Sequence, residues 1–394
     1  MEDSMKRAVE AAVEFRHELH RHPEISWHEV ETTKRIIAKL EALGIPIVKK
    51  GFAGTECGLI AEVKGEKPGP TLMIRADIDA LPVTENPDLP YRSECEGAMH
   101  ACGHDAHISV MTAVAQIVNE HKDELCGTVK FLFQPAEEAG TESGAPAVIA
   151  DGALEGVDAI IGQHIWSMYD FGVIGWAKGP MMGSADIWDI TIHGKGGHGS
   201  QPHFAVNPML CAAALIHALT AITPQEVSAL EPVVVGIGSI KSGDARNIIP
   251  DTCVMSGTVR CSNKETSKSM PARFKRIAEG TAAAWNCTVD VNYQQVYPVV
   301  VNDPDLTQWM IDVVKAEGLG SQLKELEFNM ASEDFSHYGE KVPAAFIHVG
   351  MGTGEPHHSP AFRVDDAVMP LCIKIFTAFA LDFGKTHGKK DAAE

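Results

Sequence analysis

The spacing of apolar residues in the first part of the chain predicts helices that alternate with buried strands. Residues 5–21 and 27–43 place apolar side chains three and four positions apart, which is the spacing of an amphipathic helix. Short apolar runs between turn-forming residues predict buried strands at 57–63, 71–76, 128–134 and 157–163. Because helical patterns at 107–119 and 147–154 lie among these runs, we expect an α/β fold whose central, mostly parallel sheet is flanked by helices.

A different pattern occupies residues 184–296. Here the predicted elements follow in the order βαββαβ, at 185–193, 207–222, 233–240, 252–260, 265–285 and 287–294. This order is typical of a compact, ferredoxin-like α+β unit, and its length suits an inserted domain. The α/β pattern then resumes, with predicted elements at 306–317, 344–349 and 367–383. We therefore expect a split first domain, residues 1–183 and 297–394, and an inserted second domain.

Composition narrows the class of protein. The 394 residues are 45% hydrophobic and 22% charged, as in an ordinary globular protein. The formal net charge of −20 argues against a nucleic acid or an anionic membrane as a partner, since both require a basic face. The nine cysteines form no close-spaced framework, the first residues lack the apolar run of a signal peptide, and no stretch reaches the ~18 apolar residues of a membrane span. We expect a cytoplasmic protein.

Residues 100–107, with the sequence HACGHDAH, concentrate metal-binding side chains. They hold a thiol (Cys102), imidazoles (His100, His104, His107) and a carboxylate (Asp105). Thiolates and imidazoles are the usual protein ligands of zinc and similar ions, and carboxylates complete or orient such sites. Taken singly, each histidine would be a surface or helix-cap residue, and Cys102 a small buried hydrophobic residue. Their density favours a metal site.

Further candidate ligands follow strands of the predicted sheet. Glu137 and Glu138 come after the third predicted strand, His164 comes after the fourth, and His357 and His358 lie in a late loop. Ligand sites of parallel sheets form beyond the carboxyl ends of the strands, so we expect these side chains to share one site. Singly, they would be a helix-start carboxylate, a core histidine and surface loop residues.

The candidate ligands are Cys102, His104, Glu138, His164 and one of His357 and His358. Such a set suits Zn, Mn, Co or Ni better than Ca or Mg. Because it exceeds what one tetrahedral ion takes, we expect two ions that share a bridging ligand. Glu137 would then accept a proton from a water polarised by the ions and pass it to a leaving group. This chemistry hydrolyses an amide, an ester or a phosphate, and the residues alone leave that choice open.

A series of motifs resembles a known family in order and spacing: RADIDALP, HACGHDAH, QPAEE, GQHIW, GKGGHGSQPH, NIIPD with GTVR, MASEDF and HHSPAF. From about residue 16 to about residue 379, the chain resembles the metallopeptidase-like amidohydrolases. These include hippurate hydrolase, indole-acetyl-amino-acid hydrolase and N-acetyl-diaminopimelate deacetylase, and they are related to aminoacylase and the glutamate carboxypeptidases. The resemblance implies a two-metal enzyme whose inserted domain, 184–296, acts as a lid and carries the dimer contact.

The resemblance also implies roles in the first domain. Cys102 would bridge the two ions, and the other ligands would be His104, Glu138, His164 and His358. Glu137 would be the general base and later the general acid, with a water between the metals as nucleophile. Asp79 would orient a ligand from behind.

In the inserted domain, the resemblance implies roles for His198, Asn247 and Arg260. His198 would reach across a dimer to polarise the scissile carbonyl. Asn247 and Arg260 would hold the carbonyl or carboxylate of the substrate, which suits the fork of an arginine. The ordinary alternatives are a histidine in a glycine turn and a surface charge at a strand end.

We therefore expect a cytoplasmic, two-metal amidohydrolase that cleaves N-acetyl, N-benzoyl or indole-acetyl amino acids. Its ions would be Mn or Zn, with Co or Ni as further candidates, and it would form a homodimer or a dimer of dimers. One alternative is a metallo-dipeptidase or carboxypeptidase that acts on small peptides. The other is a non-catalytic protein that binds metal or amino acids, which has no need for a base such as Glu137 beside the ligand Glu138.

Overall fold

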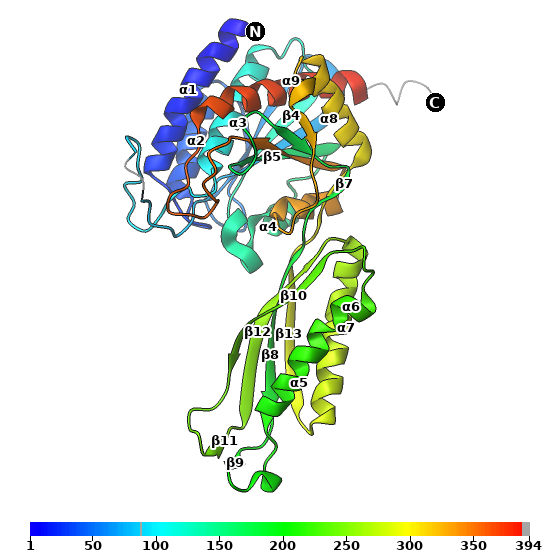
Figure 1. The fold of residues 1–394 in the computed structure, drawn as a ribbon. Helices are drawn as coiled ribbons and strands as arrows, with labels where there is room; N and C mark the ends of the chain where they lie inside the picture. Colours follow the sequence, from blue (N-terminus) through cyan, green and yellow to red (C-terminus); the bar gives the residue numbers. More distant parts are fainter. Residues whose placement is uncertain (87–88, 388–394) are drawn as a thin grey trace. The chain divides into compact units, whose positions relative to one another are not determined.

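The computed structural model describes residues 1–86 and 89–387, and the chain forms two compact units (Figure 1). Unit 1 comprises Met1–Gly179, Val301–Glu327 and His337–Glu394, and unit 2 comprises Pro180–Val300 and Phe328–Ser336. The chain therefore leaves unit 1 to build most of unit 2, returns, and later adds a short second segment to unit 2.

That second segment, Phe328–Ser336, departs from the sequence-based boundaries, which placed it with the first domain. It belongs to unit 2 because its backbone oxygens accept hydrogen bonds from residues of that unit. The N–H of Gly183 donates to the backbone oxygens of Asn329 and Ala331, and Arg260 donates to the backbone oxygen of Met330.

The sheet of unit 1 is parallel at its centre, antiparallel toward one edge and mixed toward the other. Its strand order is β1-β2-β4-β3-β5-β16-β6-β15. The strands are β1 (Ile47–Lys50), β2 (Leu59–Lys64), β3 (Lys67–Asp77), β4 (Cys126–Gln134), β5 (Ala159–Trp166), β6 (Ile174–Trp176), β15 (Leu323–Glu325) and β16 (Ala344–Gly350). β3 pairs in parallel with β4 and β5, and β16 pairs in parallel with β5. The late strands β15 and β16 thus join the two later segments of unit 1 to the first segment in one sheet.

Helices flank this sheet and bury their apolar faces against it. They are α1 (Glu2–Arg21), α2 (Val30–Ala42), α3 (His104–Glu120), α4 (Gly144–Ala150), α8 (Pro304–Ala316) and α9 (Met369–His387). α3 is buried along most of its length and packs against α1, α9 and β3. Its first residue is His104, directly after Gly103, which takes the left-handed conformation with φ of 89°. The helix therefore presents its N-terminus, and not its middle, to the candidate site.

Unit 2 is an antiparallel sheet with two main helices. Its elements are β8 (Ala185–His193), α5 (Pro208–Thr220), β10 (Val233–Lys241), β12 (Thr252–Cys261), α7 (Lys264–Ala284) and β13 (Thr288–Tyr297). The sheet order β10-β12-β8-β13 gives the ferredoxin-like arrangement. Trp188 and Phe274 centre its own core, with rings 5.0 Å apart. Beyond one end of this sheet, β9 (Gly197–His198) and β11 (Ile248–Ile249) form a short ladder (Figure 1).

Two helical stretches, Pro208–Glu226 and Asp366–His387, are long and apolar enough to cross a membrane by length and composition alone. The sequence expectation that no such stretch exists was therefore too strict. In the second, 67% of the apolar window is buried, and its helix α9 packs against α3 and β3 as a core helix of unit 1. In the first, 33% is buried, and α5 packs against α7 and β12.

The predicted fold class is confirmed, and the differences lie at element ends. α3 begins at His104, earlier than the predicted 107, because Gly103 permits the turn that starts it. β5 continues to Trp166, because β16 pairs with it along its whole C-terminal half. His164 therefore lies within a strand and not after it. The short edge strands β1, β6 and β15 bury too few side chains to show a clear pattern in the sequence.

Candidate metal centre

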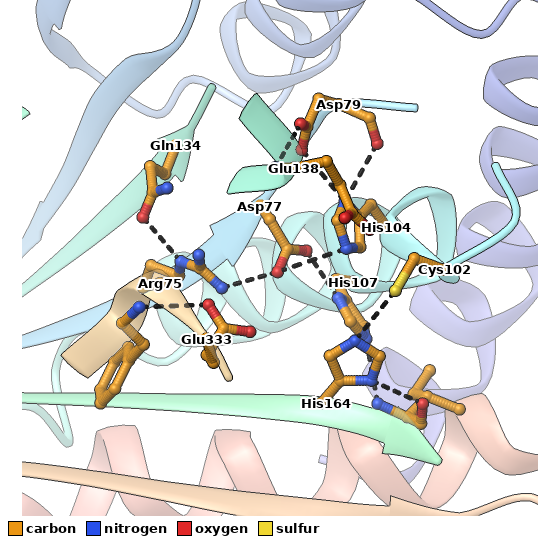
Figure 2. Close-up of polar contacts among 12 residues, drawn as sticks. Arg75, Asp77, Asp79, Cys102, His104, His107, Gln134, Glu138, His164 and Glu333 are labelled. Carbon is orange, nitrogen blue, oxygen red and sulfur yellow. Dashed lines mark hydrogen bonds and ion pairs between the residues drawn. The ribbon is translucent and has the colours of Figure 1, made fainter. Parts of the chain in front are cut away.

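The candidate ligands of unit 1 meet at the carboxyl ends of its central parallel strands (Figure 2). Three overlapping groups have their ligand atoms within 4.8 Å of one another: Cys102–His104–His164, Cys102–Glu138–His358 and His104–Glu137–Glu138. The first two groups share Cys102, which is the position that a ligand between two ions occupies. All the ligands expected from the sequence are thus brought together.

Hydrogen bonds orient two histidines toward the cluster. Nδ1 of His104 lies 3.0 Å from the backbone oxygen of Asp79 and 3.1 Å from its Oδ1, so Nδ1 carries a proton. Nδ1 of His164 donates in the same way to the backbone oxygen of Ile165, at 2.7 Å. Nε2 of His164 lies 3.3 Å from Cys102 Sγ, and Nε2 of His104 is buried without a hydrogen-bond partner. Metal-binding histidines are held in this way by the nitrogen opposite the metal.

Charge around His104 also favours a cation at this place. Burial lowers the pKa of His104, but the carboxylates of Asp77 and Asp79 outweigh burial and raise it to about 10. A proton and a metal ion therefore compete for its Nε2. Burial raises the pKa of the Cys102 thiol well above its usual value, and the carboxylates of Glu138 and Glu137 raise it further. Such a concentration of buried negative groups is what divalent cations balance.

The late loop brings His358 to Glu138. His358 Nε2 lies 3.0 Å from Glu138 Oε1, and its backbone N–H donates to the oxygen of Ala101 at 2.9 Å. Its φ of 63° turns the chain there. His357 points elsewhere, because its Nε2 donates to the backbone oxygen of Ile165 at 3.0 Å. The geometry therefore favours His358 over His357 as the ligand.

Asp79 contacts two candidate ligands from behind. Its Oδ1 accepts from His104, and its Oδ2 accepts the backbone N–H of Glu138 at 2.9 Å. Ser26 Oγ donates to the same Oδ2 at 2.6 Å. Burial raises the pKa of Asp79, but these bonds outweigh burial and lower it below its usual value.

Asp77 and His107 link three elements behind the cluster. Arg75 Nη1 and His107 Nδ1 each donate to Asp77 at 2.6 Å, and the backbone N–H of Ile165 donates to His107 Nε2 at 3.0 Å (Figure 2). This series of hydrogen bonds joins the end of β3 to α3 and β5. Although the ligand atoms of Asp77, His104 and His107 also lie within 4.8 Å of one another, both oxygens of Asp77 and both nitrogens of His107 already have partners.

Two other side chains of HACGHDAH have different partners. Asp105 Oδ2 accepts from Arg16 Nη1 at 3.1 Å and from His20 Nδ1 at 2.9 Å, in a buried ion network that anchors the start of α3 to α1. His100 is buried and belongs to none of the ligand groups found among the described residues. The density of this motif therefore reflects two neighbouring structures, a ligand cluster and an ion network.

The candidate residues of unit 2 fall into two places. His198 pairs with Ile248 across the β9–β11 ladder, and the N–H of Gly199 donates to the oxygen of Asn247 at 2.9 Å. His198 and Asn247 are exposed neighbours. Arg260 lies near the other end of β12, where its Nη1 donates to Met330 O and Ser332 Oγ, each at 3.1 Å. At about 3.3 Å per residue, β12 separates the two places by roughly 25 Å.

The donor set fits two divalent transition-metal ions, because buried imidazole, thiolate and carboxylate atoms converge in overlapping groups and one imidazole nitrogen has no hydrogen-bond partner. Glu137, a further buried carboxylate, lies at the same place. This fold and this cluster define a metal-dependent hydrolase.

Comparison with known proteins identifies the family. The model of peptidase family M20/M25/M40 matches residues 73–382. This chain belongs to peptidase family M20/M25/M40, and the resemblance recognised in its sequence is confirmed.

Three known proteins illustrate the similarity. The N-acetylcysteine deacetylase of Bacillus subtilis (strain 168) is 39% identical over 369 residues, which cover 94% of this chain and 96% of that protein. Thermostable carboxypeptidase 1 of Saccharolobus solfataricus is 34% identical, with 97% of this chain and 98% of that protein covered. The crystal structure of the Bacillus subtilis YXEP protein, described as a dinuclear metal-binding peptidase of the M20 family, is 36% identical and superposes with a TM-score of 0.86, covering 97% of this chain and 99% of that one. The predicted class, a metal-dependent amidohydrolase, is confirmed.

Several supporting residues were not found from the sequence. Arg75 and Arg16 bond residues far along the chain, Gln134 and Asp105, and no local pattern marks them, whereas His107 was noted in HACGHDAH without its contact to Asp77 being expected. His107 carried one usable signal, since it lies three positions after His104 and so faces the same side of a helix. Ser26 carried no such signal.

Proposed function

We propose that this protein hydrolyses the amide bond of N-acyl amino acids, giving a carboxylic acid and a free amino acid. The observation that carries the proposal is the pair Glu137 and Glu138 in the ligand cluster, where Glu138 is grouped with Cys102 and His358. The adjacent Glu137 is close enough to serve the same site as a base. The name of the similar deacetylase supports an N-acyl amino acid as the substrate.

In this proposal two ions would be held by Cys102, as their shared ligand, and by His104, Glu138, His164 and His358. Manganese or zinc is the preferred pair, with cobalt or nickel as further candidates. When bound, the ions supply Lewis acidity, which lowers the pKa of water and stabilises negative charge on a carbonyl oxygen. Asp79 keeps the His104 ring and the Glu138 backbone in place.

Glu137 moves the protons. It takes a proton from the attacking water and gives it to the departing amide nitrogen. Its place supports this role, because Glu137 is buried and its carboxylate lies within 4.8 Å of the ligand atoms of His104 and Glu138.

We also assign roles in unit 2. The N–H of Ser200 donates to His198 Nδ1 at 3.2 Å, so the neutral ring carries its proton on Nε2 and can donate to a substrate carbonyl. Arg260 would bind the carboxylate of the amino acid, and Asn247 would assist His198. Because His198 and Asn247 lie far from Arg260 within unit 2, we propose that they serve the site of a partner copy in a cytoplasmic homodimer or dimer of dimers. Residues 184–296 would form the lid and the dimer contact.

A second candidate is a carboxypeptidase or dipeptidase, which the name of the similar thermostable carboxypeptidase favours. Such an enzyme would accept peptides with a free amino group. The two candidate activities can be distinguished by offering the same amino acid in two forms. One is the N-acyl derivative, whose amino group is blocked, and the other is a dipeptide with a free amino group.

The test is amino-acid release from a panel of N-acetyl, N-benzoyl and indole-acetyl amino acids and matching dipeptides. The protein is stripped of metal and reloaded with Mn, Zn, Co or Ni. Metal-dependent release from the N-acyl substrates supports the proposal. Preference for dipeptides favours the second candidate, and folded, metal-loaded protein without release from either class would contradict both.

A further inference from the structure

The turn that carries Glu137 and Glu138 is conformationally strained. Ala136 has φ of 55° and ψ of 44°, and Gly140 has φ of 60° and ψ of −114°. The left-handed region is costly for a residue with a side chain, so surrounding contacts must hold Ala136 there. The 3₁₀ helix Glu137–Glu142 follows directly, so the position of Glu137 depends on how this turn is held.

One short segment near the N-terminus, Ser26–Glu29, makes three separate bonds to this turn or to its support. Glu29 Oε1 accepts the N–H of Ala136 at 2.8 Å. Trp27 Nε1 donates to the backbone oxygen of Glu142 at 2.5 Å. Ser26 donates to Asp79, which in turn accepts the N–H of Glu138.

The segment is itself fixed to the sheet. Ile25 forms a parallel bridge with Ala80, and the N–H of Ala80 donates to Glu24 O at 2.8 Å. Trp27 has φ of 65°, a second unfavourable backbone conformation on the same contact surface. Strained residues on both sides of a contact indicate that it is determined by the fold and not by local preference.

The side chain of Glu29 does not cap the helix that follows it. It is the N-cap residue of α2, yet its side chain makes no capping hydrogen bond. Glu24 caps the helix in its place, because its carboxylate accepts the N–H of Thr32 at 2.7 Å and that of Glu31 at 3.3 Å. The Glu29 carboxyl is fully buried, 107 positions from Ala136 in the chain, and directed at that N–H.

We propose that Ser26, Trp27 and Glu29 are positioning residues that hold the Ala136–Glu142 turn, and that Glu29 sets the position of Glu137 for proton transfer. This inference rests on the proposed role of Glu137 as the base. Glu138 has a second restraint through Asp79, whereas the bond from Glu29 to Ala136 acts immediately before Glu137. Loss of the Glu29 contact therefore affects turnover more than metal binding.

Glu29 holds the turn as a hydrogen-bond acceptor, and this contact does not require a negative charge on its carboxyl group. Burial, with a contribution from Asp79, raises the pKa of Glu29 to about 8. The neutral carboxyl still offers Oε1 to Ala136, and so does the amide of a glutamine. Glu29→Gln thus preserves the contact, while Glu29→Ala removes it.

The experiment compares Glu29→Ala, Glu29→Gln and the control Glu24→Ala in the full-length, metal-loaded protein. Turnover is measured with the panel substrate that the wild type cleaves fastest, together with metal content, metal affinity and melting temperature. We expect Glu29→Ala to lower kcat about 10–100-fold with KM nearly unchanged, since small misplacements of reacting groups have effects of this size. Glu29→Gln should restore kcat to nearly the wild-type value. Glu24→Ala should lower the melting temperature through the lost cap and leave kcat unchanged.

Hydrogen–deuterium exchange provides a readout without turnover. Glu29→Ala should speed exchange in peptides covering 136–142, whereas Glu24→Ala should speed it at the start of α2. Wild-type exchange of 136–142 in Glu29→Ala would overturn the inference, as would a kcat loss that only follows lost metal or a Glu29→Gln variant as slow as Glu29→Ala. An inactive wild type with altered exchange in Glu29→Ala would instead refute the proposed function and leave the positioning contact established.

Discussion

In unit 1, candidate residues from separate parts of the chain converge on one largely buried place, with His358 at its exposed side, whereas in unit 2 the candidates lie at two ends of a sheet. The unit 1 residues contact one another and share supports such as Asp79. The unit 2 residues have separate supports among the described residues, Ser200 and Ile248 for His198, and Met330 and Ser332 for Arg260. Among the described residues, unit 1 therefore supplies the candidate ligand cluster by itself, whereas in the proposal above the residues of unit 2 act on a substrate only in combination with another surface.

The strongest test of the unit 1 cluster is Glu137→Gln. We expect a loss of kcat of about 10²–10⁴-fold, the usual effect of removing a general base. Metal content should not change, because the other ligands remain. The control is Glu155→Gln, an exposed carboxylate of the same unit, which should retain full activity. Retained turnover in Glu137→Gln would remove Glu137 from the mechanism.

Cys102→Ser tests whether Cys102 is a ligand that two ions share. A hydroxyl is a poorer ligand than a thiolate for these ions, so elemental analysis should find metal content reduced at least about tenfold under limiting metal. Cys372→Ser changes another buried thiol, in α9, and should keep its metal. Equal metal content in the two variants would contradict the bridging role.

His198→Ala tests unit 2. We expect kcat to fall about 10–100-fold, as for a lost donor to a reacting carbonyl. His203→Ala, an exposed histidine five positions later, is the control. Mixing equal amounts of the impaired His198→Ala and Glu137→Gln variants should raise the activity above that of either variant alone, up to about a quarter of the wild-type value, if each copy completes its partner's site. Mixtures that stay inactive after subunit exchange would show that His198 serves its own copy.

The smallest effect concerns the ion network at the start of α3. Burial lowers the pKa of His20, but hydrogen bonds to Asp105 and Glu85 outweigh burial and raise it from 6.5 to about 9. Because the folded pKa is the higher one, the protonated ring stabilises the fold fully below pH 6.5, and this contribution is lost as the pH rises through 9. We expect the free energy of unfolding to fall by about 3 kcal/mol as the pH rises through this range. Urea unfolding should show a flatter pH dependence in His20→Gln, and an unchanged slope would contradict this account.

Much of the fold and of the ligand set could be predicted because both depend on local patterns. The motif HACGHDAH and residues that follow buried strands identified Cys102, Glu138 and His164 before their distances were known. The bond between Glu29 and Ala136 and the ion pair of Arg16 with Asp105 could not be predicted, because they join residues far apart in the chain. The left-handed Ala136 also gave no signal, since alanine is not a residue that marks such a turn.

The place of β16 in the sheet has a consequence for how the protein is made. β16 pairs with β5, but it is synthesised after nearly all of unit 2. Domains fold as they leave the ribosome, so unit 2 can be complete while the sheet of unit 1 still lacks a central strand. His358 follows β16, so the group Cys102–Glu138–His358 is whole only when the last part of the chain has emerged. A chain cut short before β16 would keep every residue of unit 2 but would lack both a central strand of the unit 1 sheet and the candidate ligand His358.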